Sequence, residues 1–489
     1  MKPNGQTILE QLEPLSPLDL KACATVSDIV NGMMQCSFGA RMLGEVAETL
    51  TEWAIENRRV EIICDARPDD QIWNFFARIR KFAPSFHPTY ATHFIESGVM
   101  AGNGLIVGPI PGYLEQEISR RIERKIFVNS HFQCTPGQVR DGHFPDVVFS
   151  DPSLIIPILF HVLRESVRGE YSSVGDLMTS LEICTGVGKE VVHGAHTLTK
   201  MLRDPECTVM LTLSGAMTIA KMQLLVADLI ETGRVKYVAA TGALMAHGLV
   251  EGSGCRHYKY DPQFSDESLA AEGLNRVTDT IEPETNFDHI EKIVAEVLDG
   301  YDGREDICSS RFHRDLGAYL EKNFPGERAI LSAAYRQRVP VVTPAFTDSE
   351  LANDVFVHNV RRVREGRAPV VFNQERDTAV LFDLATSAKR LGIFTIGGGV
   401  PRNNTQNVAP LIEIYNARLG EQQPAGRFFY ACRVDPAPMS LGHLSGCTYR
   451  EGGTWRKFDF DGQFAEVHCD ATIAWPFMQK FALEKLERG

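Results

Sequence analysis

One short segment near the C-terminal end carries side chains suited to amine chemistry. The segment "EGGTWRKF" contains Glu451, Trp455 and Lys457. A neutral lysine amine forms a Schiff base with a carbonyl, or exchanges with an imine, when burial or a cationic neighbour lowers its pKa. Trp455 could offer a cationic ligand its aromatic face, and Glu451 could hold an ammonium group. Arg456 cannot serve as the nucleophile because its guanidinium stays protonated. The same spacing also fits ordinary packing beside a solvated basic pair.

The elements around this segment alternate between strand and helix from about residue 173 onwards. Buried strand patterns such as "CTVMLTL", "RVKYVAA" and "IFTI" each lead into small residues and then a helical pattern. This alternation predicts an α/β fold, a Rossmann-like open parallel sheet with helices on both faces. Ligands of such sheets sit beyond the carboxyl ends of the strands.

Three of the predicted strands end in small residues. They are followed by "LSGAMT" (213–218), "ATGAL" (240–244) and "TIGGGVPRNN" (395–404). Glycines let the backbone approach a ligand closely, and such loops can donate N–H groups to phosphate. Each alone fits a tight turn equally well, but three on adjacent strands indicate a nucleotide crevice. Asp348, after another strand, fits either a ribose contact or a helix N-cap.

Composition excludes some classes of protein. The chain of 489 residues has a net charge of -13, which disfavours nucleic acid as a partner and suits cationic ligands such as polyamines. Its 11 cysteines are scattered without a C-x-x-C pair, so neither structural zinc, nor another metal, nor a disulfide framework is expected. We predict a cytoplasmic protein, because neither a signal-peptide pattern nor an apolar run long enough to span a membrane stands out.

The N-terminal third has a different texture. Helical spacing over 41–57, a short strand after it, a strand within 100–112 and an amphipathic helix over 112–127 predict an α/β addition. We therefore expect an N-terminal region of unknown role at 1–170 and a catalytic domain at 171–489. Segments 25–50 and 173–198 align without a gap, which fits either a partial internal repeat or two similar amphipathic helices.

Taken in order, several segments resemble the deoxyhypusine synthase family. The resemblance covers about residues 170–489 and rests on "LSGAMT", "ATGALMAHGLVEGSGCRHY", "VPVVTPAFTD", "IGGGVPRNN", "GHLSGCTYREGGTWRKF" and "EVHCDATIAWP". It implies that Lys457 is the nucleophile and that Glu451 and Trp455 bind the polyamine substrate. The fold it implies agrees with the open parallel sheet predicted from the strand pattern.

The family's reaction implies NAD as the cofactor and a transferase of the EC 2.5.1 class. Bound NAD dehydrogenates spermidine, 1,3-diaminopropane leaves, and the aminobutyl group passes through a lysine imine to an acceptor amine. The resemblance places NAD contacts at Ser214, Gly215, Ala216, Met217, Thr218, Thr241, Gly242, Asp348, Gly398, Gly399, Ser445, Gly446, Asp470 and Ala471. It also implies a homotetramer with active sites between subunits.

This chain departs from the eukaryotic pattern in three ways. Asn403 stands in place of a histidine after the triple glycine, Met245 and Ala246 replace an acidic pair, and Leu444 replaces an aspartate. The pattern resembles the bacterial deoxyhypusine-synthase-like branch, in which the acceptor is either a protein lysine or putrescine, giving homospermidine. Asn403 is then expected in the substrate site without an acid–base role. Two alternatives stay open: NAD-dependent amine dehydrogenation without transfer, and a catalytically weak, NAD-binding regulatory paralogue.

Overall fold

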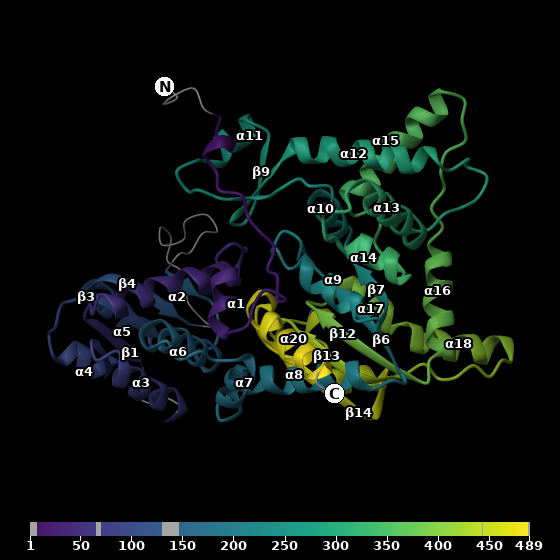
Figure 1. Cartoon of the computed structure of the whole chain (residues 1–489). Helices are drawn as coiled ribbons and strands as arrows, with labels where there is room; N and C mark the ends of the chain where they lie inside the picture. Colours follow the sequence, from purple (N-terminus) through teal and green to yellow (C-terminus); the bar gives the residue numbers. More distant parts are fainter. Residues whose placement is uncertain (1–6, 65–69, 130–145, 443, 488–489) are drawn as a thin grey trace. The chain divides into compact units, whose positions relative to one another are not determined.

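The computed structural model describes residues 7–64, 70–129, 146–442 and 444–487 (Figure 1). These residues form two compact units. Unit 1 comprises Met1–Pro17, His196–Glu466 and Lys485–Gly489, and unit 2 comprises Leu18–Ala195 and Val467–Glu484. The domain boundary predicted near residue 170 stays a prediction, and each unit is described below by itself.

Unit 1 is built around a six-stranded sheet with the order β11-β7-β6-β12-β13-β14. The pairs from β11 to β13 are all parallel. Numbered along the chain, this is the 3-2-1-4-5-6 order of dinucleotide-binding sheets, in which the strand order reverses between the first and fourth strands. Here that switch point lies between β6 and β12. The strands are β6 (Cys207–Leu213), β7 (Val235–Ala240), β11 (Val341–Val342), β12 (Arg390–Ile396), β13 (Phe428–Val434) and β14 (Phe458–Val467).

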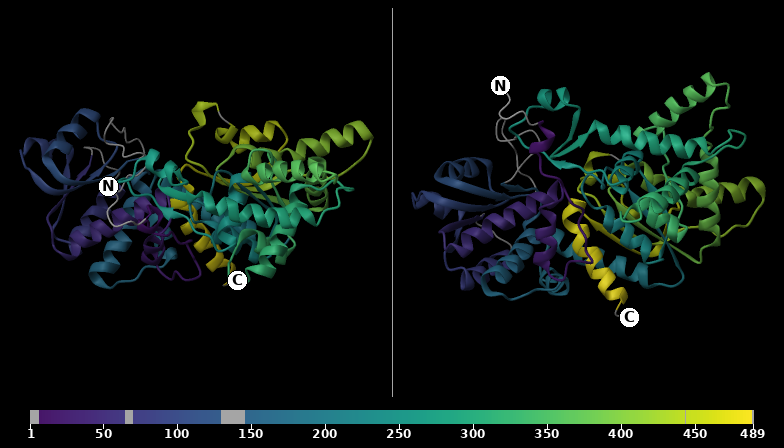
Figure 2. Two further views of the ribbon diagram at one scale, coloured as in Figure 1. Left: turned by 90° about the horizontal axis from the view of Figure 1, so that it is seen from above. Right: turned by 45° about the horizontal axis from the view of Figure 1, so that its top comes forward.

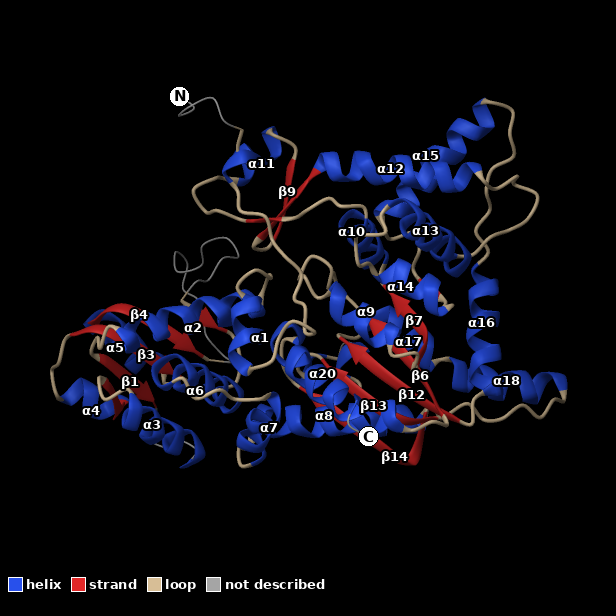
Figure 3. Cartoon of the chain, in the orientation of Figure 1, coloured by secondary structure: helices blue, strands red, loops and turns tan. Residues whose placement is uncertain are grey.

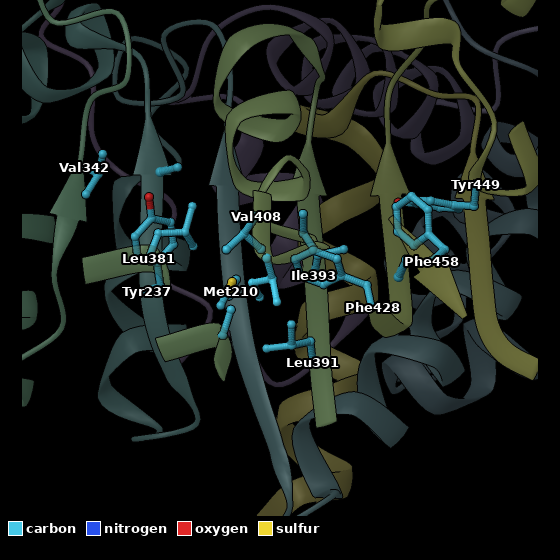
Figure 4. Packing of buried hydrophobic residues seen from close by; sticks show 14 residues of the cluster. Met210, Tyr237, Val342, Leu381, Leu391, Ile393, Val408, Phe428, Tyr449 and Phe458 are labelled. Carbon is cyan, nitrogen blue, oxygen red and sulfur yellow. The ribbon is translucent and has the colours of Figure 1, made fainter. Parts of the chain in front are cut away.

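Buried apolar side chains hold helices against this sheet. Met210, Tyr237 and Ile393 project from the central strands into one cluster (Figure 4). Leu381 and Val408, from two helices that follow β11 and β12 in the chain, complete it. Residues 209–213 of β6 are buried without a break, which shows that both faces of the strand are covered. The predicted open parallel sheet with helices on both faces is therefore confirmed.

The remaining elements of unit 1 are helices and a small antiparallel sheet of order β8-β10-β9. Figure 3 shows helices surrounding the sheet strands. The sheet strands are β8 (Tyr258–Lys259), β9 (Leu274–Val277) and β10 (Thr280–Pro283). The helices are α9 (Gln223–Glu231), α10 (Gly242–Gly252), α11 (Asp266–Ala271), α12 (Glu284–Asp299), α13 (Ser309–Asn323), α14 (Ile330–Gln337), α15 (Glu350–Arg364), α16 (Gln374–Ser387), α17 (Gly399–Gln406), α18 (Val408–Leu419) and α19 (Tyr449–Thr454), with short 3-10 turns at Leu9–Gln11, Met439–Leu441 and Leu444–Gly446.

Unit 2 contains a second parallel sheet with the order β2-β1-β3-β4-β5. Figure 2 shows two further views of the chain, in which the purple and blue segments from Leu18 onwards belong to this unit. This 2-1-3-4-5 order is the other common doubly wound arrangement, so the predicted N-terminal α/β addition is confirmed. Its elements are α1 (Val26–Met33), α2 (Gly39–Ile55), β1 (Val60–Cys64), α3 (Asp70–Phe82), β2 (Phe86–Tyr90), α4 (Ala91–Glu96), β3 (Ala101–Val107), α5 (Gly112–Arg121), β4 (Ile122–Val128), β5 (Val147–Val148), α6 (Pro152–Arg168) and α7 (Val174–Glu182). Helices α8 (Gly186–Arg203) and α20 (Ala471–Glu487) run from one unit into the other.

One sequence prediction in unit 2 is wrong. The amphipathic helix expected over 112–127 ends at Arg121, and β4 begins at Ile122. Pairing of β4 with β3 and β5 supplies hydrogen bonds that the local charge pattern does not reveal, and Ile126, Phe127 and Val128 are buried there. Tertiary pairing therefore overrides the helical pattern in the second half of the segment.

The two aligned segments, 25–50 and 173–198, form similar local structures. Each begins a helix pair, α1–α2 and α7–α8, with a capping box in which Thr25 or Ser173 exchanges hydrogen bonds with an aspartate three residues later. This shared N-cap requirement accounts for the matching Thr/Ser-x-x-Asp spacing. It does not decide between an internal repeat and two independent helix pairs.

Within the described residues, no helix is long and apolar enough to cross a membrane. The ten described cysteines are thiols rather than disulfides, and most of them are buried. Scattered thiols used as small core residues account for this pattern.

Candidate active site

The small-residue loops predicted to form a crevice meet at the switch point of the unit 1 sheet. Ser214 follows β6, and its hydroxyl hydrogen-bonds the carbonyl of Gly398, which follows β12. Thr241, after β7, donates its hydroxyl to the carbonyl of Gly215 at 2.7 Å and caps α10. The strand ends of β6, β7 and β12 are thus connected directly, as a shared ligand edge requires. In the rest of the 214–218 loop, the Thr218 hydroxyl donates to the carbonyl of Leu244 at 3.2 Å, and the carbonyls of Ala216 and Met217 accept from Ala220 and Met222.

At two positions of this edge only glycine fits, because residues of neighbouring loops lie very close to its backbone. A Cβ added at Gly398 would lie 2.5 Å from the Cβ of Ser445, and one added at Gly242 would lie 2.8 Å from the Ser349 hydroxyl. Gly399 has φ +64° and begins α17, so its own backbone also disfavours a side chain. These positions form a tight backbone cradle that has no room for side chains.

We expect Gly398→Ala to weaken binding at this edge strongly. The new methyl group overlaps Ser445 and pushes apart the loops that follow β12 and β13. The KM for NAD is expected to rise at least tenfold, roughly 1.4 kcal/mol or more of lost binding. Gly326→Ala is the matched control, because a Cβ at Gly326 meets no atom within 4 Å. Steady-state kinetics with both variants test this, and an unchanged KM in Gly398→Ala would contradict it.

Lys457 lies in a half-buried position beside Asn403. Its Nζ donates to the Oδ1 of Asn403 at 2.8 Å. Desolvation by burial lowers the pKa of Lys457, the nearby Cys447 thiol opposes this shift, and the guanidinium of Arg402 adds to it. The neutral amine is therefore more accessible here than on an exposed lysine.

Two buried arginines fix the loop in front of Lys457. Arg402 donates to the carbonyls of Ser445 and Cys447 at 3.2 and 2.8 Å, and Arg433 donates to the same two carbonyls. Both guanidinium groups also lie over the ring of Tyr449. No sequence pattern indicated this clamp, because the arginines are 31 positions apart and each stands inside an ordinary helix or strand pattern. Gly446, within the clamped loop, is buried.

The residues beside Lys457 divide into distinct environments. Arg456, the other member of the basic pair, forms an ion pair with Glu413 at 2.6 Å, whereas Lys457 bonds Asn403. Glu451 lies exposed on α19, with its amide capped by the Thr448 hydroxyl at 3.2 Å. Trp455 closes α19 and is 65% exposed, so its ring is free to receive a cation.

The structure places the last predicted contacts as follows. Asp348 precedes α15, and the N-cap of α15 is Ser349, whose hydroxyl accepts from the amide of Ala352. The N-cap interpretation of Asp348 is therefore wrong. The backbone carbonyl oxygen of Asp348 lies 3.1 Å from the position that a Cβ added at Gly242 would occupy. Asp470 and Ala471 belong to unit 2, where the Asp470 carboxylate accepts from the amides of Gly39 and Thr472.

A buried ion network in unit 1 was not predicted from the sequence. His257 is bonded through Nδ1 to Glu251 at 2.5 Å and through Nε2 to Glu282. Lys221 also pairs with Glu251, and His247 bonds Glu282 at 2.9 Å. Ligand atoms of His247, His257 and Glu282 lie within 4.8 Å of one another, a spacing that a metal ion could use. Lys221 lies against the Glu251 carboxylate and His257 against both carboxylates, so these two residues can offset the buried negative charge.

The comparisons with known proteins agree with this geometry. The family model for deoxyhypusine synthase matches residues 176–481, which is more than half of the chain. The chain belongs to the deoxyhypusine synthase family. "Probable deoxyhypusine synthase 2" of Archaeoglobus fulgidus is 30% identical over 294 residues, covering 60% of this chain and 92% of the relative. The "Deoxyhypusine synthase-like protein" of Elusimicrobium minutum is 26% identical, and the match covers 65% of this chain and 82% of that relative's length.

A crystal structure of a candidate deoxyhypusine synthase from Entamoeba histolytica covers 63% of this chain and 93% of its own, with a TM-score of 0.44 and 13% identity. This likeness is too distant to carry an argument. The family match begins at residue 176, so most of unit 2 lies outside it.

Proposed function

We propose that this protein is an NAD-dependent 4-aminobutyl transferase in which Lys457 is the nucleophile. The observation that carries the proposal is the half-buried Nζ of Lys457, whose pKa is lowered by burial and whose nearest partner is the neutral amide of Asn403. A carboxylate in that place would hold the amine protonated, whereas an amide oxygen does not. Spermidine or putrescine is the proposed donor.

The switch-point edge suits NAD. Gly242 and Gly398 let the loops at this edge pack closely against Ser349 and Ser445. Ser214 follows β6, which flanks the reversal in strand order, and Thr241 follows the neighbouring strand β7. We propose Ser214–Thr218, Thr241, Gly242, Asp348, Gly398, Gly399, Ser445 and Gly446 as its binding residues in unit 1. The contacts predicted at Asp470 and Ala471, which belong to unit 2, stay predictions. NAD bound there would supply a hydride acceptor for the donor carbon next to nitrogen and, once reduced, a hydride donor for the product imine.

The chain's own residues carry the transfer. The neutral Nζ of Lys457 adds to the C=N carbon of the dehydrogenated donor, the leaving amine departs with a proton, and the four-carbon chain stays on Lys457 as an imine. The acceptor amine then adds to the same carbon, and Lys457 departs as a free amine. The Arg402 clamp fixes the loop beside Lys457, while Trp455 and Glu451 hold the cationic end of the chain.

The acceptor is proposed to be a protein lysine, giving deoxyhypusine, or putrescine, giving homospermidine. We also propose a cytoplasmic homotetramer. Mass spectrometry of the products formed from NAD, spermidine and putrescine together tests the function, and homospermidine with 1,3-diaminopropane would support the diamine acceptor. Oxidised donor without any transfer product would instead support amine dehydrogenation.

Asn403→Asp is expected to shift the pH dependence of transfer upwards. A carboxylate at 2.8 Å from Nζ favours the charged amine, so the pKa of Lys457 should rise. Because the neutral amine is the nucleophile, the ascending limb of the kcat profile should move to higher pH. Asn403→Leu is the control: it removes the hydrogen bond without adding charge and should not move the limb upwards. An unshifted profile in Asn403→Asp would show that Lys457 does not control the rate.

A further inference from the structure

A second candidate ligand site lies in unit 1, beside the edge strand β11. A cavity of about 740 Å³ opens there, within the size range of small-molecule sites. Its wall combines arginines with an apolar surface and comes from α13, α14, β11 and α16. The lining residues that matter below are Arg311, His313, Arg314, Tyr335, Arg336 and Arg338.

The wall of this cavity is rich in arginine although the whole chain is acidic. Among the described residues that line it, four are arginines and none is Asp or Glu. Arg311 and Arg314 each make an ion pair with one carboxylate outside the lining, and Arg336 makes ion pairs with two, Glu231 and Glu321. Arg338 has no carboxylate partner within the described part of the chain. Guanidinium groups bind phosphate oxygens through paired N–H donors, so this wall suits an anion with several oxygens.

Arg338 occupies a backbone position that usually belongs to glycine. It ends α14 with φ 54° and ψ 38°, and the amide of Val339 bonds the carbonyl of Ala334 at 2.9 Å across it. Helices α6 and α18 end in the same left-handed conformation on Gly169 and Gly420. An arginine kept in this strained conformation indicates a role for its side chain, since glycine would fit the turn without strain.

His313 adds a hydrogen-bond acceptor to the apolar side of the wall. Its Nδ1 bonds the carbonyl of Val341 at 2.9 Å and so carries the proton, which leaves a lone pair on Nε2. Nε2 is buried and has no hydrogen-bond partner among the described residues. A buried acceptor is stabilised when a ligand supplies an N–H or O–H donor. Tyr335, 42% exposed, offers an aromatic face at the same wall.

We propose that this cavity binds a phosphorylated small molecule of nucleotide size, with its phosphates on the arginines and its flat, donor-bearing body against the apolar wall. The proposal goes beyond aminobutyl transfer and does not depend on it, because none of the lining residues belongs to the proposed catalytic or cofactor sets. A ligand there would make the protein responsive to the nucleotide pool.

Calorimetric titration of the full-length protein with ATP tests this, with NAD held at saturation and divalent ions chelated. We expect one additional ATP per chain, weaker binding of pyrophosphate, no binding of adenosine, and affinity that falls as salt rises. Arg338→Gly should weaken ATP binding at least tenfold while the melting temperature without ATP stays equal or rises, because glycine relieves the strained turn. Arg314→Gln should weaken ATP binding without raising the melting temperature.

Arg364→Gln, at the exposed end of α15 and outside the lining, is the matched control and should bind ATP like the wild type. Absence of ATP binding at millimolar concentration would overturn the proposal. So would ATP binding that Arg338→Gly and Arg314→Gln leave unchanged, or pyrophosphate binding as tight as ATP. Transfer activity without ATP is expected to be unchanged in all three variants, so failure here is separable from failure of the proposed function.

Discussion

Lys457→Arg is expected to abolish aminobutyl transfer while leaving NAD binding in place. Arginine keeps a cation and a donor within reach of Asn403, but its guanidinium does not lose a proton and cannot form the imine. Loss of a covalent nucleophile lowers kcat by a factor on the order of 10⁴ or more. The measurement is product formation from spermidine and putrescine, with NAD affinity determined by fluorescence titration on the same sample.

Lys389→Arg is the matched control, since Lys389 is 75% exposed and forms a surface ion pair with Glu206. It should transfer at the wild-type rate. Full transfer activity in Lys457→Arg would show that the nucleophile is another group or that transfer is direct. Loss of NAD affinity together with activity would instead place Lys457 in a structural role.

The second large effect concerns the stability of unit 1. His257→Gln is expected to lower the free energy of unfolding by about 3–5 kcal/mol, because it leaves a buried carboxylate uncompensated. His257 has no exposed side-chain surface, and Glu251 and Glu282 are 5% and 1% exposed, so water cannot replace the lost charge. Urea unfolding followed by fluorescence measures the change, and the exposed His193→Gln is the matched control.

A double variant separates lost charge balance from lost packing. Glu282→Gln added to His257→Gln removes the unpaired charge and should restore part of the stability, giving a coupling energy in a double-mutant cycle. If the double variant is as unstable as the sum of the singles, the network acts only through packing.

The pH dependence of the His257→Gln penalty follows from the two pKa shifts. Burial opposes the charge on both groups, but hydrogen bonds with the partner carboxylates raise the pKa of His257, and those with His247 and His257 lower the pKa of Glu282 to about 2. The stabilisation that His257 contributes is complete below the pKa of histidine in the unfolded chain, about 6.5. It is lost as the pH rises through the higher pKa that His257 has in the folded protein. Stabilisation by Glu282 is present above about pH 4.3 and is lost as pH falls towards 2. The loss of unfolding free energy in His257→Gln should therefore be largest between about pH 4.3 and 6.5, and smaller at pH 9.

Sequence patterns predicted the features that depend on local order. The strand ends at Ser214, Thr241 and Gly398 follow from buried strand patterns that lead into small residues, and parallel pairing brings these ends to one edge. The contrast between Arg456 and Lys457 followed from their proton chemistry, and their separate partners, Glu413 and Asn403, agree with it.

Features that depend on distant pairing were out of reach of those patterns. The turn from α5 into β4 at Ile122 is imposed by strands elsewhere in the chain. The Arg402 and Arg433 clamp depends on two arginines meeting the same carbonyls, and the His257 network joins residues from 221 to 282. Charged side chains are normally exposed to solvent, so only the fold shows that the residues of the clamp and of the His257 network are buried and paired.

The most direct test of the central claim is capture of the lysine imine. The protein is incubated with NAD and isotope-labelled spermidine, reduced with borohydride, and digested for peptide mass spectrometry. A four-carbon amine adduct on the peptide containing Lys457, absent without NAD and absent from Lys457→Arg, is the predicted result. A protein that forms transfer product under the same conditions and carries no adduct on Lys457 would contradict the account.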